Sequence, residues 1–237
     1  MGNLRKICAV TGSRADYGLL RILLKNIDQD QETELHLIVT GAHLDSRFQG
    51  VADEIQGDGL DIAARVPILS DQDSRLQTAQ AMAKALDGVA TALAEIKPDL
   101  VVVLGDRYEI LAAAEAAIIL GIPLGHIHGG EITEGAMDDS FRHAITKLAY
   151  LHFAAAETYR QRIIQMGEDP NRVYNVGALG VDNIQEMEPI NKVELNDLLG
   201  KLLAERNVLM TYHPVTSGID DHGKALKSAF KALDRFL

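Results

Sequence analysis

The sequence predicts an α/β fold built around a doubly wound parallel sheet. Short apolar segments that suit buried strands alternate with longer segments in which leucine, isoleucine and alanine recur at helical spacing. Residues 100–104 consist of leucine and valine, as expected for a strand that is covered on both faces. The strict alternation of the two kinds of segment favours parallel strands joined by right-handed crossovers.

The expected strands are short and apolar, and they cover residues 7–10, 35–39, 63–68, 100–104, 122–127, 151–155 and 172–176. The helices expected between them carry their apolar residues on one side, and they cover residues 17–27, 49–55, 75–96, 108–120, 140–148 and 157–166. The Lys97-Pro98 pair ends the longest of these helices, because proline cannot continue it.

The pattern changes after Gly177, so the chain divides into residues 1–176 and residues 177–237. The first part is expected to form an N-terminal domain around the sheet. The second part is expected to contain a linker at residues 178–184, followed by a helix, a strand and a helix at residues 192–205, 207–211 and 222–236. Because one strand and two helices bury too little apolar surface for stability, we interpret this part as the start of a truncated second domain.

Charge and composition exclude several classes of protein. The chain has 23 Lys and Arg against 34 Asp and Glu, a net charge of −11, which argues against a general nucleic-acid surface. The single cysteine, Cys8, lies in an apolar strand and indicates a core residue in a reducing compartment. We find neither a signal peptide nor an apolar run of the roughly 20 residues that a membrane span needs, so we expect a cytoplasmic protein without a membrane partner.

The first loop, which contains Gly12, Ser13 and Arg14, joins a strand to a helix. The free N–H groups at a helix N-terminus bind anions, and a guanidinium adds a phosphate contact. The alternative is a simple capped helix, with Asp16 as the cap and Arg14 in solvent. The loop matches neither the dinucleotide-binding glycine pattern nor the P-loop, so no nicotinamide cofactor is expected.

Two further loops carry titratable side chains. Asp106 directly follows the strand at residues 100–104 and is either a ligand-facing carboxylate or a helix cap. The segment from His126 to His143 combines histidines, carboxylates and an arginine with the paired glycines Gly129 and Gly130, which let a backbone approach a ligand. Such a set suits acid–base chemistry, and the alternative is a polar loop in which Asp139 caps a helix.

A metallophosphatase is a competing interpretation of the Gly-Asp and Gly-Gly-Glu sequences. That chemistry requires an Asp-x-His pair after the first strand, where this chain has Thr11, Gly12 and Ser13. The histidines also lack the spacing of a zinc site. We therefore expect neither a metal nor a cofactor.

Five sequence strings, in this order, resemble the hydrolysing UDP-N-acetylglucosamine 2-epimerases of sialic acid synthesis, and they occupy residues 13–18, 105–109, 126–131, 138–147 and 212–216. The resemblance covers essentially the whole chain. It implies a two-domain glycosyltransferase-B-type fold, with the active site between two Rossmann-like halves. Residues 1–176 would be the N-terminal half, and residues 177–237 the start of a C-terminal half.

The resemblance also implies a reaction, in which UDP-N-acetylglucosamine and water give N-acetylmannosamine and UDP. A base removes the C2 proton as UDP leaves, and water then adds to C1 of the resulting 2-acetamidoglucal. Asp106, Glu131 and Asp138, or Asp139 in place of its neighbour Asp138, would serve as acid–base groups, and His213 would assist the departing UDP. The resemblance and the loop patterns together place substrate contacts at Gly12, Ser13, Arg14, His128, Asp139, Arg142 and His143.

Three questions stay open in the sequence. Many relatives have Glu where this chain has His128, so either His128 or Glu131 takes the proton-transfer role. The substrate can instead be a UDP- or GDP-diacetamido-trideoxyhexose of a legionaminic-type pathway, and a chain that ends at residue 237 can be a non-catalytic sugar-nucleotide-binding module. We also expect a homo-oligomer, a dimer or tetramer, in which the alanine-rich helix at residues 75–96 can contact a second subunit.

Overall fold

A computed structural model describes residues 4–48, 51–70, 74–205, 207–212 and 222–233. Seven parallel strands form one sheet in the order β3-β2-β1-β4-β5-β6-β7. The strands are β1 (Arg5–Thr11), β2 (Thr33–Thr40), β3 (Ile62–Val66), β4 (Leu100–Leu104), β5 (Leu124–Ile127), β6 (Leu151–Ala154) and β7 (Val173–Asn175). The expected doubly wound parallel sheet is confirmed.

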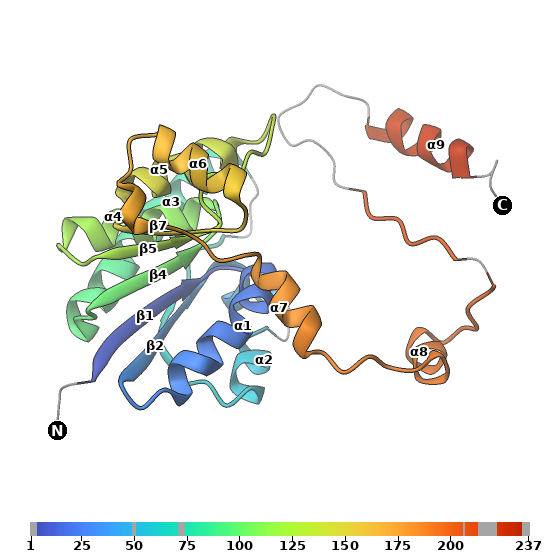
Figure 1. Cartoon of the computed structure of the whole chain (residues 1–237), viewed down its shortest axis with the longest axis horizontal. Coiled ribbons are helices and arrows are strands. Elements are labelled where there is room, and N and C mark those ends of the chain that lie inside the picture. The colour runs from blue at the N-terminus through green and yellow to red at the C-terminus, as the bar shows by residue number, and fades with distance from the viewer. Residues whose placement is uncertain (1–3, 49–50, 71–73, 206, 213–221, 234–237) are drawn as a thin grey trace.

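Helices cover both faces of the sheet (Figure 1). One face carries α1 (Arg14–Gln29), α2 (Val51–Gly57) and α7 (Leu179–Glu186). The other carries α3 (Arg75–Ile96), α4 (Tyr108–Ile119), α5 (Met137–Leu148) and α6 (Glu157–Gln165). Alternate strand residues serve the two faces, since Cys8 and Val10 pack toward α3 and α4 whereas Ala9 packs toward α1.

Two local features fix the ends of helices. Ser13 caps α1 and forms a capping box with Asp16. Lys97 ends α3 in a left-handed conformation with φ of 53°, directly before Pro98. The Ser13 cap and the proline after α3 follow the residue preferences of helix termini, whereas Lys97 takes a left-handed conformation that usually falls to glycine.

The alanine-rich face of α3 is used within the chain. Ala81, Ala85 and Ala92 are buried in the same core cluster as the alanines of α4. The exposed alanines of the same helix, Ala79, Ala83 and Ala94, lie outside this core, and the contact with a second subunit stays a prediction. Among the helices of the described segments, none combines the length and the apolar character that a membrane crossing requires.

The region after β7 differs from the sequence-based expectation. The expected linker at residues 178–184 lies largely in the helix α7, whose Asn183 donates a hydrogen bond of 2.6 Å to the carbonyl of Gly18 on α1. Residues 207–211 were expected to be a strand, but residues 207–212 form neither helix nor strand, because none of the described strands lies beside them.

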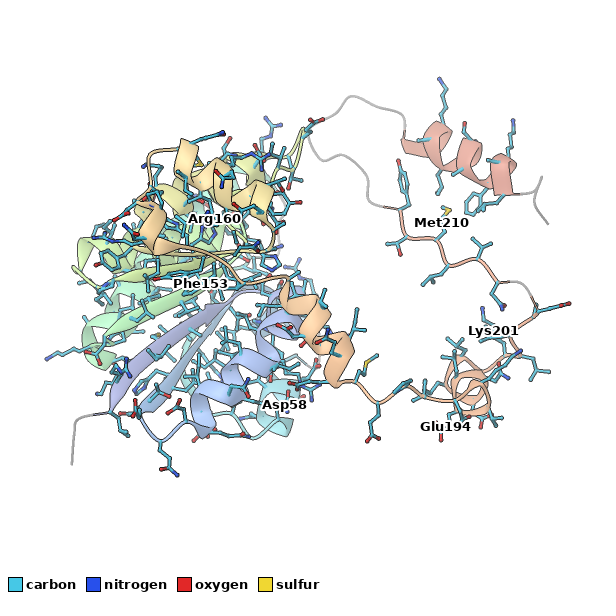
Figure 2. The ribbon with its side chains drawn as sticks, in the orientation of Figure 1. Asp58, Phe153, Arg160, Glu194, Lys201 and Met210 are labelled. Atoms are coloured by element: carbon cyan, nitrogen blue, oxygen red, sulfur yellow. The ribbon has the colours of Figure 1, made fainter. Side chains whose placement is uncertain are left out.

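Beyond α7, α8 (Lys192–Leu199) is shorter than the helix expected at residues 192–205. α9 (His222–Leu233) agrees with the helix expected at residues 222–236 over the part that the structure describes. Both lie away from the sheet (Figure 1). Glu194, Lys201 and Met210 likewise lie far from Phe153 in the sheet (Figure 2).

Candidate active site

The winding of the sheet reverses between the neighbouring strands β1 and β4. The chain leaves β1 for α1 on one face and leaves β4 for α4 on the other face. In open parallel sheets ligands bind at the carboxyl ends of strands at such a switch point. The first loop, the Asp106 loop and the segment after β5 therefore meet at one edge of the sheet.

The first loop is closed by its own carboxylate. Asp16 Oδ2 accepts hydrogen bonds from the backbone nitrogens of Gly12 and Ser13, at 3.2 and 3.0 Å. The Asp16 backbone nitrogen donates to Ser13 Oγ at 3.3 Å. Burial raises the pKa of Asp16, against the opposing effect of these hydrogen bonds. Ser13 is thus the N-cap, and Asp16 completes the capping box. The carboxylate of Asp16 binds the N–H groups of Gly12 and Ser13, which were expected to face a phosphate.

Arg14 lies at the same edge of the sheet but is not brought together with Asp106. Its Nε lies 3.5 Å from Glu54 Oε2 on α2, and 78% of its side chain is exposed. This position agrees with the alternative interpretation of the first loop, a capped helix with Arg14 in solvent. The phosphate contact that the resemblance implies for Arg14 stays a prediction.

A buried carboxylate beneath the first loop was not singled out from the sequence. Glu109 is fully buried, and its Oε1 accepts a hydrogen bond from Arg107 Nε. A Cβ on Gly12 would lie 2.5 Å from Glu109 Oε1, so this glycine is needed for the loop to pack on Glu109. Burial raises the pKa of Glu109, and the guanidinium of Arg107 opposes that shift.

The signal that could have revealed this pair was a carboxylate at the start of the helix α4, directly before a continuous apolar run. Glu109 is followed by Ile110, Leu111 and three buried alanines of α4. A charged residue at such a position needs a partner. Arg107 was the nearest cation in the sequence.

Asp106 and Arg142 form the central ion pair of the site. Gly105, at φ of +85°, turns the chain at the end of β4 and presents Asp106. Asp106 Oδ2 accepts a hydrogen bond from Arg142 Nη2 of α5, whose side chain is 8% exposed. Burial raises the pKa of Asp106, Arg142 lowers it, and the nearby carboxylate of Asp138 raises it. The pKa of Asp106 therefore depends on opposing effects of burial, Arg142 and Asp138.

His128 and Glu131 lie together beside this pair. His128 has φ of 63°, a conformation that non-glycine residues adopt rarely and often at functional sites. Its Nδ1 lies 3.2 Å from Glu131 Oε1. Burial lowers the pKa of His128, Glu131 raises it, and Arg142 lowers it. The two residues between which the sequence did not choose are thus direct neighbours.

Asp138 and Asp139 both lie in the first turn of α5, which begins at Met137 rather than at Ser140 as expected. Negative charge is favourable at a helix N-terminus. Asp139 Oδ1 accepts a hydrogen bond of 2.7 Å from the backbone nitrogen of Thr133, and Oδ2 lies 3.8 Å from His143 Nε2. The N-cap is Ala136, so Asp139 secures the preceding loop instead of capping the helix.

The structure therefore brings most of the expected site residues to one edge. Asp106, Arg142 and Asp138 interact with one another, and His128 with Glu131 lies within the electrostatic reach of Arg142. His213 lies outside the described residues. Within the part of the chain that the structure describes, no three His, Cys, Asp or Glu side chains are arranged to hold a metal ion.

Comparison with known proteins identifies the family. The profile described as UDP-N-acetylglucosamine 2-epimerase matches residues 25–237. The chain belongs to this family. The motif-based resemblance is thereby confirmed.

Two relatives in the family carry names that specify another sugar. The GDP/UDP-N,N′-diacetylbacillosamine 2-epimerase (hydrolyzing) of Campylobacter jejuni is 40% identical over 230 residues, which cover 97% of this chain and 60% of that protein. The UDP-N,N′-diacetylbacillosamine 2-epimerase (hydrolyzing) of Legionella pneumophila is 39% identical over 229 residues, with the same coverage of 97% and 60%. This chain thus spans about 60% of the length of these relatives.

A third relative carries the family's own name. The UDP-N-acetylglucosamine 2-epimerase of Neisseria meningitidis is 31% identical over 231 residues, which cover 98% of this chain and 60% of that protein. A crystal structure of UDP-GlcNAc 2-epimerase from Neisseria meningitidis, bound to UDP-GlcNAc, superposes with a TM-score of 0.68 at 18% identity and covers 82% of this chain and 51% of that chain. The fold is therefore the expected half of a glycosyltransferase-B-type architecture.

Proposed function

We propose that this chain provides the acid–base half of a hydrolysing 2-epimerase that acts on a nucleoside diphosphate-linked 2,4-diacetamido-2,4,6-trideoxyhexose. The observation that carries the proposal is the identity of 40% and 39%, over 97% of the chain, to two enzymes named for N,N′-diacetylbacillosamine. The identity to the enzyme named for UDP-N-acetylglucosamine is 31%. The products are the corresponding manno-configured diacetamido sugar and the free nucleoside diphosphate.

Asp106 exchanges a proton with C2 of the sugar. Its environment supports this role, because burial and Asp138 raise its pKa while Arg142 favours the ionised form. Loss of the C2 proton and departure of the nucleoside diphosphate from C1 leave a glycal. Water then adds its oxygen to C1 and a proton returns to C2 from the opposite face, so that the configuration at C2 is inverted.

Asp138 and the His128–Glu131 pair supply the second set of proton-transfer groups. A carboxylate beside an imidazole can pass a proton to or from bound water, and both residues lie at the edge of the sheet where Asp106 also lies. Arg14 contacts the diphosphate in this proposal, and the N–H groups of Gly12 and Ser13 do so once Asp16 releases them. That contact requires Arg14 to leave Glu54, which its high exposure allows.

UDP-N-acetylglucosamine is the second candidate substrate, and the description of the family favours it. The two sugars differ at C4, where an acetamido group replaces a hydroxyl, and at C6, where a methyl group replaces a hydroxymethyl. A site that forms a buried hydrogen bond to a polar group of one sugar discriminates against the sugar that lacks this group, by up to about 10⁴-fold in kcat/KM.

The test is a comparison of kcat/KM for the full-length protein on UDP-linked and GDP-linked N,N′-diacetylbacillosamine and on UDP-N-acetylglucosamine. We expect one diacetylbacillosamine nucleotide to be preferred by at least about 100-fold. A preference for UDP-N-acetylglucosamine would contradict the substrate proposal and support the second candidate. Turnover of none of them, with tight binding of one, would instead indicate a sugar-nucleotide-binding module.

A further inference from the structure

A second histidine lies directly beneath the Asp106–Arg142 pair. His126, on β5, is completely buried on the face of the sheet that carries α5. Its Nε2 lies 2.8 Å from the carbonyl oxygen of Gly105, and its Nδ1 lies 3.2 Å from Thr146 Oγ1 on α5. Both nitrogens of a buried ring are thus in hydrogen-bonding contact with elements that carry the candidate site.

These two contacts define one form of the imidazole. A carbonyl oxygen only accepts hydrogen bonds, so the proton must be on Nε2. Burial lowers the pKa of His126 to about 3, against the opposing effect of the bond to Gly105, and electrostatic interactions with His152, Arg142 and His128 act in the same direction as burial. The ring is therefore neutral, and Nδ1 accepts a hydrogen bond from the Thr146 hydroxyl, whose single hydrogen is shared between Nδ1 and the Arg142 carbonyl oxygen.

The two partners of His126 adjoin the two members of the ion pair. Gly105 immediately precedes Asp106, and its φ of +85° sets the direction in which the chain leaves β4. Thr146 lies one helical turn after Arg142, and its Oγ1 is 3.0 Å from the Arg142 carbonyl oxygen. His126 thus links the end of β4, which carries Asp106, to the helix α5, which carries Arg142.

The loop after β5 also depends on this bridge. A Cβ on Gly129 would lie 3.0 Å from both His126 Nδ1 and Thr146 Oγ1, so the backbone at Gly129 packs directly against their hydrogen bond. Gly129 directly follows His128. The left-handed conformation of His128 places the His128 side chain beside Glu131. A movement of the imidazole would therefore displace several of the candidate groups together.

We propose that His126 is a positioning residue, which in its neutral Nε2–H form fixes the alignment of Asp106 with Arg142 through Gly105 and Thr146. The inference rests on the proposed function, because it assumes that Asp106 exchanges a proton with the sugar. It adds a residue that touches neither the sugar nor the reacting atoms.

The kinetic test replaces the hydroxyl that holds His126 Nδ1. In the full-length protein, Thr146→Val is expected to lower kcat by about 10- to 100-fold with little change in KM, because misalignment affects the transition state more than binding. Thr146→Ser keeps the hydroxyl and should restore most of kcat. The matched control is Thr33→Val, which removes a hydroxyl that donates to the Ile27 carbonyl oxygen at 2.6 Å, at the opposite end of the sheet.

The spectroscopic test needs no turnover and uses the 237-residue chain. The ¹⁵N signals of His126 should show protonated Nε2 and unprotonated Nδ1 from about pH 5 to pH 8, where an ordinary histidine titrates. The ¹³C titration of the Asp106 carboxyl should move to higher pH in Thr146→Val, because a displaced Arg142 favours the ionised form less, and should stay unchanged in Thr33→Val.

Three results would overturn the inference. They are a proton on Nδ1 of His126, a loss of kcat in Thr146→Val no larger than in Thr33→Val, or a Thr146→Ser variant as impaired as Thr146→Val. A wild-type protein that turns over no nucleotide sugar would instead defeat the proposed function, and the ¹⁵N signals would still decide whether the His126 bridge exists.

Discussion

Replacement of Asp106 by asparagine is expected to lower kcat by about 10²- to 10⁴-fold, the usual range for loss of a general acid or base. Asparagine has nearly the same volume and keeps an oxygen that can accept from Arg142 Nη2, but it cannot exchange a proton at C2. The measurement is steady-state turnover of the preferred nucleotide sugar by the full-length variant, with the fold checked by circular dichroism.

The matched control is Asp99→Asn, at the opposite end of β4. Asp99 Oδ2 accepts a hydrogen bond of 2.8 Å from the backbone nitrogen of Lys6, far from the candidate site. This variant should keep wild-type kcat. If a folded Asp106→Asn protein retained more than about a tenth of wild-type turnover, the assignment of Asp106 to proton transfer would be wrong.

The second large effect is expected on stability, from Gly130→Ala. Gly130 has φ of +77°, which alanine adopts only with strain, and an added Cβ would lie 2.5 Å from the Tyr159 carbonyl oxygen of α6. Gly130 also accepts a hydrogen bond from Arg162 Nη1 through its own carbonyl oxygen. Strain and overpacking together should lower the free energy of unfolding by about 2–4 kcal/mol, measured by urea denaturation of the 237-residue chain.

Gly18→Ala is the control for this variant. Gly18 lies within α1, and a Cβ there meets no atom within 4 Å. Alanine is the better helix former, so this variant should stabilise the chain by about 0.5–1 kcal/mol. If Gly130→Ala unfolded at the same urea concentration as the wild type, the tight packing of the loop against α6 would be disproved.

Much of the sheet was predictable because its central strands contain short runs of apolar residues. Residues 100–104, for example, are buried by helices on both faces, and their sequence has no polar residue to suggest otherwise. The helix α7 was missed because its exposed face is mixed and its position depends on α1, through the bond from Asn183 to Gly18. Such a long-range contact leaves no local periodic signal.

The location of the candidate site was predictable from the sequence, but the pairing of its side chains was not. Parallel strands end at one edge of a sheet, so the loops after them, which include Asp106 and the segment after β5, were expected to carry the site. The strand order that makes β4 and β5 neighbours comes from the structure. The ion pair of Arg14 with Glu54 and the burial of Glu109 beneath Gly12 depend on which side chains face each other across different loops. Sequence spacing does not determine such pairings.

In the proposed reaction, the carboxylates of this edge act on a sugar whose C1–oxygen bond is broken. Turnover of the preferred nucleotide sugar in H₂¹⁸O, with products analysed before the sugar exchanges its anomeric oxygen, tests it most directly. We predict one ¹⁸O in the C1 hydroxyl of the sugar and none in the nucleoside diphosphate. An ¹⁸O on the terminal phosphate of the nucleotide, with an unlabelled sugar, would mean that water attacks phosphorus and would contradict the account.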